Sequence, residues 1–233
     1  MKSISLILTT LLLINLNTLA AQEDLYDFLW LDPDKSVYVL QKKMYEKRKS
    51  FYFNAGYLKN MSSDFQSTNG FNMEFGYFFA EDWGLELMYN VYNNSDNDAF
   101  DNLKSINGQV PFVRRPLSTM AFLFNWSPFY GKINTFNKIY YFDWSFGVGI
   151  AKLDAESNAL TVADEATQNL YDRESYTGAI LKTNLKFYIS ERMHLEIDYM
   201  STIYDAPGPR INDVQTDGMT TNSDLVLSIG FSF

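Results

Sequence analysis

The chain has no cysteine and a single histidine, His194, among its 233 residues. The lack of cysteine excludes a disulfide framework, a thiolate metal site and a cysteine nucleophile. One imidazole is too few for a histidine metal cluster. Acidic residues outnumber basic ones, 28 to 19, and the formal charge is −9. Nucleic-acid binding needs a basic patch. We therefore predict no cofactor, no metal site and no nucleic-acid partner.

Long apolar runs are missing after the first 20 residues, so no later stretch offers the roughly 18 uncharged apolar residues of a membrane-spanning helix. The first 20 residues contain Lys2, then an apolar core over Ile4–Leu19, and small residues at Thr18 and Ala20. This order is typical of a secretory signal peptide. We predict cleavage after Ala20 and export of the rest, which is then either soluble or crosses a membrane as strands.

Aromatic residues are abundant: they make up 17% of the chain and include 16 Tyr and 19 Phe. Many fall in segments where apolar residues alternate with small or polar ones, which is the period of a β-strand. These segments are 51–57, 71–79, 83–91, 120–126, 142–150, 179–187, 193–199 and 225–233. The pattern predicts an all-β fold of eight antiparallel strands.

The connections between these segments alternate in length. Short turns are expected at Ala80–Asp82, Pro128–Lys132 and Ser190–Arg192, and longer loops at Lys59–Asn69, Asn93–Leu117, Asp154–Ser175 and Thr202–Ser223. Membrane-spanning barrels have short turns at one end and long loops at the other. We predict an up-and-down transmembrane β-barrel over residues 50–233. A soluble β-sandwich is the alternative.

The last strand carries apolar side chains on one face and ends on an aromatic residue. The apolar positions are Leu227, Ile229, Phe231 and Phe233. This ending resembles the C-terminal assembly signal of bacterial outer-membrane barrels, whereas a core strand of a sandwich would be the alternative. We expect Asp at Leu227 or Ile229 to block assembly, because it places charge against lipid, and Asp at Ser228 to be milder.

The opposite face of the predicted strands is charged. Its charged and ionisable members are Glu74, Glu86, Asp143, Lys182, Lys186, His194, Glu196 and Asp198. Unpaired charges are costly in a dry core, but an eight-stranded barrel has an interior that side chains can fill. If the Ser190–Arg192 turn sets the register, Lys186 faces Glu196 and Asn184 faces Asp198. We predict a polar network that fills the barrel.

Residues 21–49 differ from the rest, since they combine acidic, apolar and basic stretches without a long alternating pattern. We assign them to a periplasmic segment before the barrel. Docking under the barrel mouth and a flexible leader remain open.

The signal peptide, the eight strands and the C-terminal Phe-Ser-Phe resemble small OmpA- or OmpX-type outer-membrane barrels. Segments 32–41 and 127–138 resemble, more specifically, an outer-membrane β-barrel domain family of deltaproteobacteria. The resemblance implies an outer-membrane location but no settled activity. The peptidoglycan-binding domain of full OmpA-like proteins is not expected here.

Three functions are open from the sequence. A structural or surface-interaction role through the long loops is our prediction; passage of small or hydrophobic solutes is the alternative. The third, a lipid-modifying enzyme, would need His194 with a serine and a carboxylate, and we predict no enzyme. The acidic stretches Asn94–Asp98 and Asp154–Glu174 are either weak calcium or lipopolysaccharide contacts or solvated loops. Expected partners are outer-membrane lipid, lipopolysaccharide and the barrel-assembly machinery, with the protein a monomer.

Overall fold

The structure is a computed structural model that describes residues 43–108, 110–135, 138–162, 170–211 and 214–233. The described residues belong to one compact unit, Lys43–Phe233. The expected signal peptide, the segment 21–42 and the family resemblance over 32–41 lie outside them.

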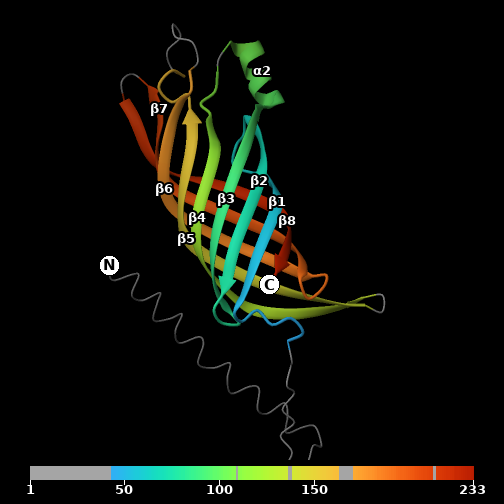
Figure 1. Ribbon diagram of the computed structural model, residues 1–233. Helices are drawn as coiled ribbons and strands as arrows, with labels where there is room; N and C mark the ends of the chain where they lie inside the picture. Colours follow the sequence, from blue (N-terminus) through green and yellow to red (C-terminus); the bar gives the residue numbers. More distant parts are fainter. Residues whose placement is uncertain (1–42, 109, 136–137, 163–169, 212–213) are drawn as a thin grey trace, which may run out of the picture. The chain divides into compact units, whose positions relative to one another are not determined.

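The described residues form a closed barrel in which each strand pairs antiparallel with its neighbours in sequence, and β8 pairs with β1 (Figure 1). The strands are β1 Ser50–Asn60, β2 Gln66–Phe78, β3 Trp83–Asp96, β4 Arg114–Thr135, β5 Lys138–Ser157, β6 Asp172–Tyr188, β7 Met193–Ile211 and β8 Val214–Ser232. This confirms the predicted eight-stranded up-and-down barrel and rules out a sandwich.

The C-terminus closes the ring. Phe51 N–H donates to the carbonyl of Phe233 at 3.1 Å, and Phe233 N–H donates back to Phe51 at 2.8 Å. The chain end is therefore held in the sheet instead of fraying into solvent. Leu227, with 60% of its surface exposed, lies on the outer wall next to Tyr57 of β1 and Ile197 of β7.

The barrel has two different ends. The short-turn end holds the connections 79–82 and 189–192 together with the start of β1 and the end of β8, and the opposite end is called the loop end. At the loop end the predicted connections 59–69 and 202–223 are wrong, because β1 runs to Asn60 and β2 begins at Gln66, while β7 runs to Ile211 and β8 begins at Val214. Backbone pairing continues there past the region where side chains alternate, so the hydrophobic pattern underestimates strand length.

The predicted turn at Pro128–Lys132 is also wrong, since β4 runs through it to Thr135. A register shift between Trp126 and Phe129 gives β4 an extra residue there, and a bulge accommodates Pro128. β4 and β5 therefore continue as a long hairpin beyond the short-turn end.

The stretch Asn94–Asp98 is not a solvated loop. Asp96 lies in β3 and forms an ion pair with Arg115 at 2.6 Å. Asn97 caps helix α2, Asp98–Asn107, because its side chain accepts the N–H of Phe100. Gly108 ends this helix at a φ of 63°, the left-handed conformation that suits glycine. The acidic side chains near α2 thus serve local structure.

Candidate functional site

The candidate site is the polar interior near the short-turn end. The structure buries all eight predicted ionisable residues there, none more than 4% exposed: Glu74, Glu86, Asp143, Lys182, Lys186, His194, Glu196 and Asp198. Strand alternation places them inside, because successive side chains point to opposite faces of the wall. They form three connected groups.

Lys182 of β6 is the centre of the first group. Its Nζ lies 2.6 Å from Glu74 of β2, 2.9 Å from Glu86 of β3 and 3.2 Å from Asp198 of β7. One ammonium therefore joins carboxylates from three other strands across the interior. Pairing of this kind is what makes buried charge tolerable.

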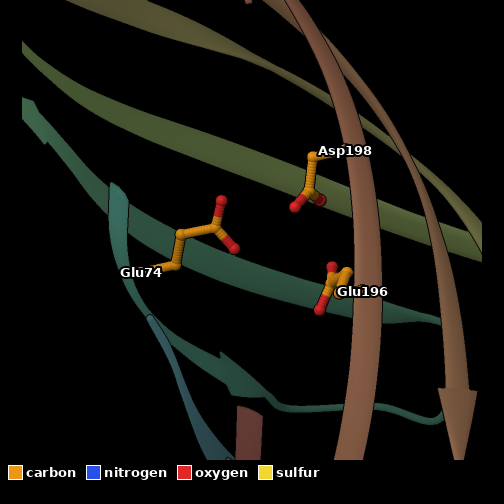
Figure 2. Close-up of side chains that lie close together, drawn as sticks. All are labelled: Glu74, Glu196 and Asp198. Atoms are coloured by element: carbon orange, nitrogen blue, oxygen red, sulfur yellow. The ribbon is translucent and has the colours of Figure 1, made fainter. Parts of the chain in front are cut away.

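Three carboxylates in the interior lie close enough together to be considered as a metal site. Oxygens of Glu74, Glu196 and Asp198 all lie within 4.8 Å of one another, and Figure 2 shows the three carboxylates around a common space. Lys182 Nζ already contacts Glu74 and Asp198 at ion-pair distance. The interior thus supplies its own cation at this cluster.

Glu196 of β7 is the centre of the second group, and amide side chains connect it to the first. Asn54 Nδ2 donates to Glu74 at 2.9 Å and to Glu196 at 2.8 Å. Asn184 donates to Glu196, and Lys186 Nζ lies 3.5 Å from the same carboxylate. The predicted register of β6 and β7 is confirmed, with Lys186 opposite Glu196 and Asn184 opposite Asp198.

His194 lies in the second group with a serine and a carboxylate nearby. Its Nε2 is 2.8 Å from Asn54 Oδ1 and 3.7 Å from Glu196, and its Nδ1 is 3.4 Å from Ser232 Oγ. Because Asn54 Nδ2 already donates to carboxylates, Asn54 Oδ1 accepts the Nε2 proton of His194. A Cβ at Gly230 would overlap Asn54 and His194. The imidazole is fully buried, so this arrangement fits a packed plug better than a hydrolytic site, which needs substrate access.

Lys47, which precedes β1, forms the third group. Its buried Nζ lies 2.6 Å from Asp143 Oδ2 and 2.6 Å from Ser127 Oγ, and Tyr188 donates to the same Asp143 oxygen at 2.7 Å. Burial lowers the pKa of the Lys47 ammonium, although Asp143 opposes this shift. Residues 43–49 therefore contact the short-turn end. The alternating pattern does not identify Lys47, because this residue lies outside any alternating segment.

We expect Lys47→Met to destabilise the barrel by about 3–5 kcal/mol, since it leaves the buried carboxylate of Asp143 without its cation. The measurement is the urea midpoint of the folded form, followed by electrophoretic mobility of unheated samples. Arg48→Met is the matched control, because that side chain is exposed. Equal midpoints for the two variants would show that Lys47 is dispensable.

An apolar layer fills the interior on the loop-end side of this network. It consists of Leu58, Met88, Tyr92, Ala121, Leu123, Ala151, Ile180, Met200 and Val226. In β6, for example, Ile180 lies nearer the loop end than Lys182, and in β7 Met200 lies nearer it than Asp198. The inward-facing positions of Met88 and Leu123 indicate this apolar layer in the sequence. The prediction of a polar inner face did not take these two residues into account.

The apolar outer wall, the satisfied backbone of a closed sheet and the filled polar interior define a transmembrane β-barrel. No helix among the described residues is both long and apolar enough to span a membrane.

No known protein family and no curated protein matches the sequence. Solved structures with some likeness include the N-terminal β-barrel domain of Pseudomonas aeruginosa OprF, at 14% identity over 80% of this chain and 98% of that chain, with a TM-score of 0.47. The P. aeruginosa outer membrane protein OprG shows 14% identity over 82% and 99%, with a TM-score of 0.45. Ail of Yersinia pestis shows 11% identity over 80% and 99%, with a TM-score of 0.42. These likenesses are weak, and the barrel is established by the strand pairing of the chain itself.

Proposed function

We propose that the protein is an integral outer-membrane barrel that does not conduct solutes and acts as a structural or surface-interaction protein through its loop end. The observation that carries this proposal is that two successive layers of side chains block the interior of the barrel. The ion network around Lys182 fills the short-turn end, and the apolar layer with Leu123 and Met200 lies beyond it. Eight strands leave an interior that side chains can fill completely.

The loop end would then face outward and the short-turn end the periplasm, as in bacterial outer-membrane barrels. Beyond the membrane-spanning band, β7 continues to Ile211 and β8 begins at Val214. Helix α2 lies in the connection between β3 and β4. Helix α2 and the described parts of these strands offer a surface for a partner. We also propose that lipopolysaccharide is a partner, that the protein is a monomer, and that residues 1–20 are a signal peptide.

Recognition by the barrel-assembly machinery is proposed from the closing strand. Leu227, Ile229, Phe231 and Phe233 are all exposed on the outer wall. Membership of the deltaproteobacterial barrel family is proposed from the sequence of segments 32–41 and 127–138 alone. Of the second segment, residues 127–135 lie in β4 and Lys138 begins β5.

The conductance of the purified barrel in planar lipid bilayers tests this proposal. We expect no stable conductance above the lipid background, whereas a general porin in the same bilayers gives open channels. Stepwise conductance from the folded protein would support the alternative, transport of small solutes. Liposome swelling with sugars provides a second readout that does not depend on ionic charge.

A further inference from the structure

The tip of the β4–β5 hairpin has no strand beside it among the described residues. β3 pairs with β4 only as far as Trp83 opposite Trp126, and β6 pairs with β5 only as far as Tyr188 opposite Tyr141. Beyond these pairs, β4 and β5 remain paired with each other to Thr135 and Lys138. Figure 1 shows this hairpin projecting sideways from the short-turn end of the barrel.

The outer face of the hairpin continues the lipid-facing surface of the barrel. The extra residue in β4 after Trp126 shifts the alternation, so that Phe129 lies opposite Trp144 and Ile133 lies opposite Tyr140. All four of these side chains are exposed, Phe129 by 53%. Without the bulge, Phe129 would point toward the interior. An isolated two-stranded ribbon is marginal in water, and this one presents an apolar face.

The tip also has the opposite charge to the rest of the chain. Residues 127–142 include Lys132 and Lys138 and no acidic residue, although the whole chain has a formal charge of −9. Both lysines are exposed. Aromatic residues and lysines together are typical of segments at the membrane–water interface, where lysine attracts anionic headgroups.

We propose that this hairpin is a membrane-interface anchor that lies on the periplasmic leaflet of the membrane that holds the barrel. Phe129, Ile133 and Tyr140 enter the interface, and Lys138, which lies on the same face of the hairpin as Tyr140, binds phospholipid phosphates. The assignment rests on the proposed membrane location of the barrel. It adds a specific lipid contact outside the barrel wall and commits to phospholipid, not to a second protein.

The lack of cysteine makes a site-specific test direct. Single cysteines replace Ile133 on the outer face, Asn134 on the opposite face, or Leu227 on the barrel wall, and each carries an environment-sensitive fluorophore. The full mature chain is refolded into vesicles of phosphatidylcholine, with or without phosphatidylglycerol, and lipid-borne quenchers report contact. We expect quenching at positions 133 and 227 and an aqueous signal at 134.

Lysine variants test the headgroup contact. Lys138→Gln should weaken quenching at position 133 in phosphatidylglycerol vesicles, with the ratio of lipid-bound to free hairpin about fivefold lower. Lys132→Gln is the matched control and should change quenching less, because Lys132 lies on the opposite face with Asn134. Both variants should have little effect in phosphatidylcholine alone.

Three outcomes would overturn the assignment. Quenching at 227 with an aqueous signal at 133 would refute the anchor while leaving the barrel intact. An aqueous signal at all three positions would instead refute the membrane location. Protection of both 133 and 134 that grows with protein concentration would show that a second copy of the chain covers the hairpin.

Discussion

Lys182→Met should lower the stability of the barrel by about 3–5 kcal/mol, or prevent its assembly altogether. The substitution keeps an unbranched side chain of similar length but removes the ammonium that contacts Glu74, Glu86 and Asp198 within 3.2 Å. Three carboxylates would then share the interior without their cation. The urea midpoint of refolding in detergent or lipid, followed by the mobility of unheated samples, measures this loss.

Lys152→Met is the matched control, since the Lys152 side chain is 63% exposed and its Nζ forms an exposed ion pair with Asp154 at 3.9 Å. An exposed pair of this kind contributes at most about 1 kcal/mol. Adding Glu74→Gln and Asp198→Asn to Lys182→Met should restore part of the stability, because the uncompensated charge is removed. A midpoint for Lys182→Met equal to that of Lys152→Met would show that the network is not important for stability.

The facing of the strands could be predicted from the sequence because alternation has a period of two, and any residue in a regular strand is then assigned to one wall. The register of β6 and β7 could also be predicted, since a short turn fixes which residues lie opposite. Lys186 opposite Glu196 is the clearest case.

The partners of Lys182 could not be predicted in the same way. Glu74 lies on β2 and Lys182 on β6, so their contact crosses the interior and depends on strand tilt and relative height in the closed barrel. Alternation gives the face of a residue but not its height. The same limitation hid the separation of the interior into an ion network and an apolar layer.

Strand ends were the least predictable feature. Pro128 reads as a turn residue, yet it lies in a bulge within β4, next to a stretch that β3 no longer covers. At the loop end, polar strand residues such as Thr68 remain paired across β2 and β3. Backbone hydrogen bonds do not require apolar side chains, so the pairing extends beyond the lipid-facing pattern.

The structure reverses the effect that we expect of Asp at Ser228 in β8. Its side chain is buried, it lies opposite Glu196, and a Cβ at Gly56 would contact it at 2.6 Å. Asp at this position would add a carboxylate to an already acidic interior. It is therefore expected to be severe, not mild, and it cannot be the control for a charge on the lipid face.

Leu227→Arg should destabilise the assembled barrel by about 2–4 kcal/mol, because a charge near the middle of the hydrocarbon layer is costly. Leu227 lies on the outer face between Leu225 and Ile229, midway along the apolar part of β8. Refolding yield and urea midpoint in lipid vesicles measure the effect. The loss should shrink when the same variant is folded in detergent micelles, which reorganise more readily around a charge.

Thr221→Arg provides the control, since position 221 lies on the same face of the same strand but near the loop end. A charge near the interface should cost no more than about 1 kcal/mol. The difference between the two variants therefore measures depth in the membrane and not tolerance of arginine in β8. Equal, small losses at both positions would mean that this wall of the barrel does not face lipid.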